Sequence, residues 1–356
     1  PAANVVRNTV HTQWQEGAAW RLEEDLRIDV TGFDGPAPSG TVVDVAEAPD
    51  GCVLLLDDST RTVWVFDDAG TFSHAFDVAE KGVRGRPPLR SADDLEFDRE
   101  GRLWIRHAFQ YSVLTPHGQP LRALTRSMRG RTHPWHVRFT GEDWFYVWGI
   151  EGDRETTSHV PLRISRAVGS VLERGQPLTH PVVRSRKGRT LPYRPRVRLA
   201  PAGESGGAWY AVSDEYTVFR RSFDGRVTRA FSLDRSAPPV TESERDSILR
   251  WTEENWTEQE GRVEPDEIPA TKHVVHGLRV DPQRGDVWIF TTLPSRAKGI
   301  DVFTDRGDFL GTLELPEPIL KVPTPRLTAK HLYVGVPCGD GGACISRLRI
   351  VRPAGR

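Results

Sequence analysis

The sequence predicts an all-β protein, a six-bladed β-propeller whose ring is closed by an N-terminal strand, with one helical insertion between blades four and five. Three observations lead to this prediction. A phrase of short apolar runs separated by Gly-containing turns recurs at residues 44–72, 94–118 and 278–309. Each recurrence has room for four strands, and a four-stranded unit repeated about every 40–50 residues is typical of a propeller blade. The last unit lacks a fourth strand, which an N-terminal segment can supply.

The first unit shows why strands are expected. Its segments 42–46, 53–57, 62–66 and 71–76 are rich in Val, Leu, Phe and Trp and alternate in part between apolar and polar residues, as short β-strands do. Asp-Gly and Asp-x-x-Gly turns separate them, and glycine supplies the positive φ that tight hairpin turns require. Units of this kind begin near six positions: Val42, Asp93, Trp135, Arg196, Gly277 and Arg326.

One propeller accounts for nearly all of the 356 residues. We expect an N-terminal extension over 1–19, the propeller over 20–353 and a short tail over 354–356. Residues 20–30 are expected to form the closing strand, because closure removes the free edges of the sheets. Residues 236–272 interrupt the repeat and are expected to form the helical insertion.

The insertion contains a helix signal. Thr241 followed by Glu244 is a capping box, and apolar residues then recur with helical spacing, which predicts a helix over 242–257. From Thr241 to Glu267 there are ten acidic residues against three arginines. A lid over the mouth of the central channel and a solvated loop are both consistent with this pattern.

A second charged stretch, residues 184–198, carries seven Arg or Lys and no acidic residue. It is consistent with an anion site, but a charged run is more often a solvated loop. We therefore interpret it as a loop.

The whole-chain charge excludes some classes of partner. The formal net charge is −1, which argues against a general nucleic-acid or membrane-surface binder. No apolar run approaches the roughly 18 residues of a transmembrane helix. The chain starts at Pro1 without Met, so we expect an extracellular or periplasmic protein that has lost a signal peptide.

The cysteines support the same localisation. Cys338 and Cys344 frame a short Gly-rich loop, and in an exported protein such a pair predicts a local disulfide. Cys52 stands alone within a strand pattern and is expected to be a small buried hydrophobic residue.

The phrases Asp-x-x-Gly-x-Leu-Trp and Val-x-Val-Phe-x-x-x-Gly resemble those of NHL-repeat six-bladed propellers, in particular secreted bacterial members. The resemblance covers roughly residues 20–352. It implies the fold, whereas members of that superfamily include lactonases, lyases, ligand sensors and protein-binding scaffolds.

Polar residues at the starts of the inner strands are the candidate site. Alignment by turn glycines places Asp93, Trp135 and His276 at one level, with Asp94 and His136 one residue further along. Arg196 and Arg326 belong to the same zone. The catalytic candidates are Asp93, Asp94, His136 and His276, and the ligand-binding candidates are Trp135, Tyr193, Arg196, Trp251 and Arg326. Alternatively, these polar residues form hydrogen bonds with one another and with water in the channel, and they have no catalytic or binding role.

The same residues include potential metal ligands. The Val275–Asp281 segment is similar to the His-Gly-Leu phrase that supplies a zinc ligand in peptidylglycine amidating lyases. His136 is displaced by one residue in this alignment, which would turn its side chain away and argues against a three-His site. Of the Glu/Asn/Asp set in gluconolactonase-like lactonases only Asp93 matches. A divalent metal held by Asp93 and His276, with His136, stays an alternative.

These observations favour a secreted or periplasmic scaffold that binds a protein or a small ligand at the channel mouth. A hydrolase or lyase that uses the polar channel residues is the alternative function. No nucleic-acid partner and no transmembrane segment are expected.

Overall fold

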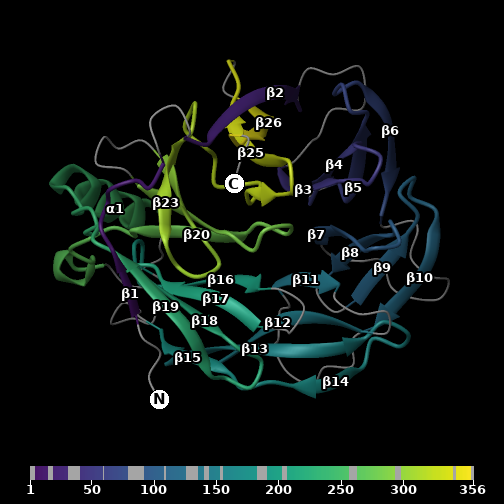
Figure 1. Cartoon of the computed structure of the whole chain (residues 1–356). Helices are drawn as coiled ribbons and strands as arrows, with labels where there is room; N and C mark the ends of the chain where they lie inside the picture. Colours follow the sequence, from purple (N-terminus) through teal and green to yellow (C-terminus); the bar gives the residue numbers. More distant parts are fainter. Residues whose placement is uncertain are drawn as a thin grey trace.

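Six β-sheets surround a common centre in the computed structural model, which confirms the predicted propeller (Figure 1). The structure describes residues 5–14, 19–30, 41–58, 60–78, 92–107, 110–125, 135–139, 144–152, 155–182, 191–202, 207–255, 263–292, 298–339 and 342–353. Each sheet is one blade, and the strands that begin at residues 42, 92, 135, 197, 275 and 326 lie nearest the centre.

The first three blades follow one another along the chain, and the third carries an extra short strand on β13. Their strands are β3 (Val42–Glu47), β4 (Val53–Asp57), β5 (Thr62–Phe66) and β6 (Phe72–Asp77) in blade one; β7 (Ala92–Phe97), β8 (Leu103–His107), β9 (Gln110–Leu114) and β10 (Pro120–Thr125) in blade two; and β11 (Trp135–Phe139), β12 (Trp144–Gly152), β13 (Thr156–Ser165), β14 (Val171–Arg174) and β15 (Leu178–Pro181) in blade three.

Blades four and six each contain a strand from the N-terminal part of the chain. The strands are β16 (Val197–Ala202), β17 (Gly207–Val212), β18 (Thr217–Arg221), β19 (Val227–Leu233) and β1 (Val5–Asn8) in blade four; β20 (Val275–Val280), β21 (Val287–Thr292), β22 (Lys298–Phe303) and β23 (Phe309–Glu314) in blade five; and β24 (Arg326–Leu327), β25 (His331–Pro337), β26 (Ala343–Val351) and β2 (Arg21–Asp29) in blade six.

The recurring Asp-x-x-Gly phrase forms the turn between the strands. The Asp67 and Asp98 Oδ1 atoms each accept a hydrogen bond of 2.8 Å from the backbone N–H four residues later. The glycines that follow, Gly70 and Gly101, have φ of 81° and 73°, a region that glycine enters without steric cost. In two other turns the Thr115 and Thr304 hydroxyls accept the equivalent hydrogen bond, so each of these turns combines an acceptor side chain with a glycine.

The core lies between the blades. Because successive side chains of a strand point to opposite faces, each blade contributes apolar residues to the contacts on both of its sides. Trp64, Trp104, Trp148 and Trp288 are fully buried there. Trp144 is only partly buried; it packs against Tyr146 and lies 5.7 Å from the Arg163 guanidinium.

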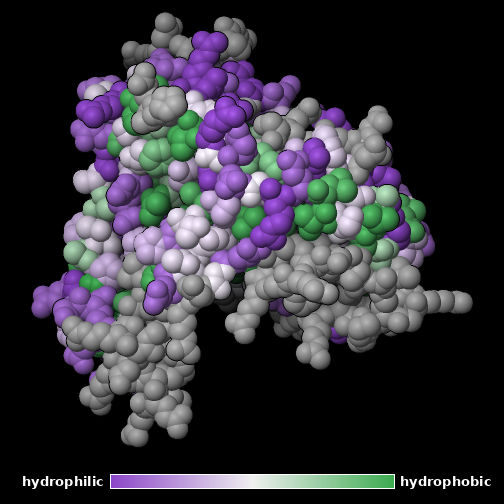
Figure 2. Space-filling view, turned by 90° about the horizontal axis from the view of Figure 1, so that it is seen from below, coloured by the Kyte–Doolittle hydropathy of each residue, from purple (hydrophilic) through white to green (hydrophobic). Residues whose placement is uncertain are grey.

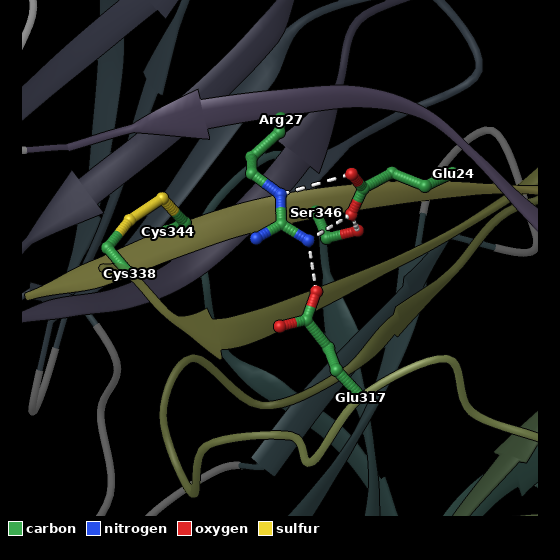
Figure 3. The surroundings of a disulfide bond; sticks show 6 residues. All are labelled: Glu24, Arg27, Glu317, Cys338, Cys344 and Ser346. Atoms are coloured by element: carbon green, nitrogen blue, oxygen red, sulfur yellow. Dashed lines mark hydrogen bonds and ion pairs between the residues drawn. A yellow bond between two sulfur atoms is a disulfide. The ribbon is translucent and has the colours of Figure 1, made fainter.

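The predicted closing strand is present. β2 pairs antiparallel with β26, with Arg21 opposite Val351 and Asp29 opposite Cys344. A charged cluster supports this contact: Arg27 forms ion pairs with Glu24 and Glu317, and Ser346 donates a 2.6 Å hydrogen bond to Glu24 (Figure 3).

Figure 3 also shows the disulfide that joins Cys338 and Cys344, with a Cα–Cα distance of 5.4 Å, as the sequence predicted. Cys52 is free and only partly buried, packed beside the core between blades one and two.

Residues before the closing strand form a strap that the sequence did not predict. β1 adds to blade four, parallel to β19, with Val5 opposite Ala230. Asn8 then joins blades four and five: its Nδ2 donates to the Ser232 and Gly307 carbonyls at 3.1 and 3.0 Å, and its Oδ1 accepts from Phe309 N–H at 3.0 Å. Trp14 stacks on Trp20, with ring centroids 6.1 Å apart.

The predicted helix is α1 (Glu242–Asn255), which lies outside the ring beside blades four and five (Figure 1). Its capping box forms: Thr241 N–H donates to Glu244 Oε2 at 2.9 Å, and Glu244 N–H donates to Thr241 Oγ1 at 3.3 Å. The last two residues of the predicted range, 256 and 257, lie outside the described part of the chain. A short 3-10 helix, η2 (Pro265–Glu267), follows α1 and leads toward β20.

Hydrophilic and hydrophobic residues alternate over the side seen in Figure 2. Among the described residues, no helix has the length and apolar character needed to cross a membrane.

Candidate functional site

The inner strands of several blades share a bulge near their beginnings. In blades one, two and five the paired register skips a single residue: Val43, Asp93 and His276 respectively. The register of β11 shifts between Trp135 and Arg138, so the extra residue there is 136 or 137. Bulges at such positions redirect side chains and are common near functional sites.

This register corrects the alignment by turn glycines. Trp135 corresponds to Ala92 and Val275, one residue before the bulge, and not to Asp93 and His276. The strand pairing places either His136 or Val137 at the position equivalent to Asp93 and His276, so it does not establish the one-residue displacement of His136 that argued against a three-His site. The side chains of Asp93, Trp135 and His136 lie outside the described part, and His276 is exposed, with its ring centroid 6.0 Å from that of His273.

Blades one and two supply an acidic side to the centre of the ring. Asp44 is buried and its Oδ2 accepts a 2.6 Å hydrogen bond from Leu95 N–H, which links the two inner strands. Burial and the nearby Asp94 carboxylate raise the pKa of Asp44 well above its usual value, against the effect of Arg326. Glu96 forms an ion pair with Arg326 from blade six.

Asp94 is buried, and its Oδ2 lies 3.6 Å from Arg106 Nε, too far for a hydrogen bond. Burial lowers the pKa of Arg326, but the surrounding Glu96, Asp44 and Asp94 carboxylates outweigh it and raise that pKa overall. The acidic side is therefore largely balanced by Arg106 and Arg326.

Blades four and five supply a basic side. Arg279 in β20 donates from Nε to the Pro325 carbonyl and from Nη1 to the Leu278 carbonyl, both at 2.5 Å. Burial lowers its pKa to about 10; Arg326 and Arg198 add to this decrease, whereas Asp44 and Asp94 oppose it. Burial and the adjacent Arg196 likewise lower the pKa of Arg198 in β16 to about 10.

Neither Arg198 nor Arg279 forms an ion pair with a carboxylate among the described residues. The Nε atoms of Arg196 and Arg198 are buried and donate to no acceptor within the same part of the chain. Arg198 Nη2 contacts His273 Nδ1 at 3.5 Å, while His273 Nε2 lies 2.7 Å from the Arg194 carbonyl. Because a carbonyl only accepts, Nε2 carries the proton and Nδ1 accepts from Arg198.

A chain of contacts connects this basic side to α1. The Tyr193 ring lies edge-on to His273 at 6.4 Å and also lines a pocket of about 270 Å³ against α1. The exposed Trp251 and half-buried Tyr193, both predicted as ligand contacts, meet in this pocket. The structure thus brings Tyr193 and Trp251 together and places Arg196 beside Arg198, whereas Arg326 lies with the acidic residues.

The basic stretch was interpreted above as a solvated loop. Its described end contradicts this interpretation, because Arg196 and Arg198 are partly buried beside the centre of the ring. Residues 183–190 lie outside the described part.

Metal ligation is a separate question for this site. Among the described residues, one group of three potential metal ligands is found, Asp29 with Cys338 and Cys344, and the two sulfurs in it are joined in the disulfide. The predicted metal residues Asp93 and His136 contribute no described side chain, so the metal hypothesis stays a prediction.

Four site residues were missed from the sequence: Asp44, Glu96, Arg198 and Arg279. Each is a charged residue with an apolar residue on either side of it in an inner strand, as in Val43-Asp44-Val45. A charge in such a run is rarely buried without a partner. This pattern in the sequence therefore predicts charged residues that line the centre of the ring.

Comparisons with known proteins support the fold. No family model and no curated protein sequence matches the chain. Two similar solved structures are a Bacteroides fragilis protein inferred to be exported (10% identity, TM-score 0.54, covering 98% of this chain and 100% of that one) and a DUF4221 family member from Bacteroides vulgatus (10% identity, TM-score 0.56, covering 94% and 99%). At this identity the likeness concerns the architecture, and the NHL-repeat assignment stays a prediction.

Proposed function

We propose that this protein is an exported propeller that binds an anionic small molecule at the centre of its ring, through the basic side formed by Arg198 and Arg279. One observation carries the proposal: these two guanidiniums come from adjacent blades, are partly buried, and form no direct ion pair with a carboxylate among the described residues.

Electrostatics favours an anion over a neutral ligand. Burying a charge is costly unless it is paired, and the lowered pKa values of Arg198 and Arg279 express that cost. A bound carboxylate or phosphate would supply the missing charge, and the planar guanidinium group suits both.

The Cys338–Cys344 disulfide supports export, because structural disulfides persist in oxidising compartments. The similar fold of a protein inferred to be exported agrees with this.

Titration calorimetry with citrate and succinate at low salt tests the binding. We expect both anions to bind, and expect Arg198→Gln and Arg279→Gln each to weaken binding at least about tenfold, because a lost charge-assisted hydrogen bond costs about 1.5–3 kcal/mol. Added chloride should also weaken it. Arg250→Gln, in the exposed part of α1, is the matched control. Equal affinities in all four proteins, or no binding of either anion to the wild type, would contradict the proposal.

The second candidate function is that of a hydrolase or lyase, and the bulge near the start of the inner strands favours it. Asp93 and His276 occupy equivalent bulge positions, and the bulge in blade three falls at His136 or the next residue. Such a set could act as acid and base or hold a divalent metal, with Asp94 nearby. Elemental analysis of the purified protein tests the metal: a stoichiometric metal lost in Asp93→Ala and His276→Ala supports it, and its retention in both variants contradicts it.

A further inference from the structure

The pocket beside α1 lies outside the ring of blades, as the helix itself does (Figure 1). Two residues before β16 form one wall, Pro192 and Tyr193, and five residues of α1 form the other: Ser243, Glu244, Ser247, Ile248 and Trp251. Side chains three or four residues apart are neighbours on a helix surface, so the five residues of α1 present one continuous face to this pocket.

The wall opposite α1 is held in place. The Tyr193 backbone has φ of 54°, which is uncommon for a residue other than glycine. Tyr193 and Ile248 pack against one buried cluster: Leu191, Val240, Val263 and Ile268. Burial and the Glu244 carboxylate raise the pKa of Tyr193, against the effect of Lys272, so the Tyr193 ring lies close to the first turns of α1.

Trp251 is unusual in its exposure. Its side chain is 52% exposed, and no other Trp, Tyr or Phe among the described residues is exposed to a similar degree. A large aromatic side chain in water forgoes the free energy that its burial provides. Trp and Tyr are also enriched in the parts of protein surfaces that contact partners. Trp251 is therefore the side chain of this pocket that a partner would cover.

The charges of α1 favour a cationic partner. The helix carries five acidic residues against two arginines, and its last turn contains no basic residue. Glu254 is exposed and follows Trp251 by three residues, which places both on the same side of the helix. The carbonyl end of a helix is also partially negative. A cation beside Trp251 would therefore meet negative potential from both sources.

The basic residues of this region do not line the pocket. Lys272 pairs with the Glu244 carboxylate at 2.8 Å, so these two charges offset each other. Arg245 donates to the Pro265 and Ile268 carbonyls. Arg250 is exposed next to Trp251, and Asp246 four residues earlier opposes its charge.

The polar part of the wall offers hydrogen-bond acceptors. Ser247 Oγ donates to the Ser243 carbonyl at 2.8 Å, so its proton is used and its lone pairs remain for a donor. Acceptors and aromatic rings together suit the N–H groups of an arginine or lysine side chain, because a cation is attracted to the face of Trp or Tyr. The apolar stem of such a side chain suits Pro192 and Ile248.

We propose that this pocket is a docking site for a basic segment of a protein partner, with an Arg or Lys side chain of that segment against Trp251 and Tyr193. The volume of about 270 Å³ lies just below the range of about 300–1,000 Å³ for small-molecule sites, which favours one side chain of a partner over a free ligand. This interaction is separate from anion binding at the centre of the ring, since neither Arg198 nor Arg279 lines the pocket.

Calorimetry at low salt with blocked peptides of alternating glycine and arginine tests the proposal. We expect the arginine peptide and its lysine counterpart to bind. Peptides with citrulline or leucine in place of arginine should not bind, because they lack the charge. Trp251→Leu should weaken binding of the arginine peptide at least about fivefold, and Glu254→Gln about twofold.

Asp246→Asn is the matched control, because it removes an exposed charge of the same helix outside the pocket lining. It should weaken binding less than Glu254→Gln does, and thermal unfolding establishes that each variant is folded. Arginine-peptide affinity unchanged in folded Trp251→Leu overturns the proposal, and so does equal weakening by Asp246→Asn and Glu254→Gln. Failure of the arginine peptide to bind, or equal binding of the leucine peptide, also overturns it. Tetramethylammonium binding as tightly as the peptide would show a small-molecule site instead.

Discussion

Asp44 shows how one buried side chain links fold and site. Its Oδ2 accepts the Leu95 N–H across two inner strands, so a hydrogen-bond acceptor is needed at this position. Burial and the nearby Asp94 raise the pKa of the Asp44 carboxyl, which means that they disfavour its negatively charged form. The residue therefore stabilises the contact between blades one and two best in its neutral form.

Asp44→Asn is predicted to raise the melting temperature at pH 7.5, because the amide oxygen keeps the acceptor and removes the buried charge. With a folded-state pKa above the unfolded value of about 3.9, the stability that Asp44 contributes is complete below that value and is lost as pH rises. The advantage of the variant should therefore grow from pH 4 to pH 7.5. Scanning calorimetry across this range checks it, with the exposed Asp246→Asn as control. An advantage that shrinks with rising pH is the contrary result.

At the scale of elements, the N-terminal strap is the least expected contact. Asn8 makes three hydrogen bonds to backbone groups of blades four and five. It thereby satisfies groups at the outer edges of two neighbouring sheets, which would otherwise be open.

Asn8→Ala is predicted to destabilise the fold by about 1–3 kcal/mol, because the partners lose hydrogen bonds in a partly buried site. Urea unfolding measures the change. The control is Asn255→Ala, which should cost less, since within the described part of the chain the Asn255 side chain bonds to the Trp251 carbonyl alone, one turn earlier in α1. Equal costs for the two variants would contradict the bridging role.

The elements differ in how far the sequence predicts them. The strands of blades one, two and five follow from apolar runs between Asp-x-x-Gly turns, and α1 follows from Thr241 and Glu244. β1 escapes prediction because four residues, Val5–Asn8, carry too little periodicity and their parallel partner is far along the chain. The bulge at Asp93 and His276 shifts side chains by one residue, and no pattern in one sequence marks where it falls.

At the scale of the whole molecule, the N-terminal region closes the ring. β2 covers the edge of β26, and the strap before it covers β19. The opposed charges of the centre depend on this closure, because Arg326 of blade six reaches Glu96 of blade two across the ring.

Two N-terminal deletions distinguish the contribution of the strap to stability from that of the closing strand β2. Removal of residues 1–14 is predicted to leave a folded protein of lower stability, since only the strap is lost. Removal of residues 1–30 also exposes the edge of β26, so we expect aggregation or loss of cooperative unfolding. Light scattering and thermal unfolding distinguish them. A cooperative monomer after the longer deletion would show that closure by β2 is dispensable.

An anion held by the basic side of the ring would be visible in a crystal. Crystals soaked in selenate, with data collected at the selenium edge, locate the bound oxyanion by its anomalous signal. We predict a peak within hydrogen-bonding distance of the Arg198 and Arg279 guanidiniums in the wild type, absent from Arg198→Gln. A wild-type map in which selenate occupies other sites and leaves these two arginines without a peak would contradict the account.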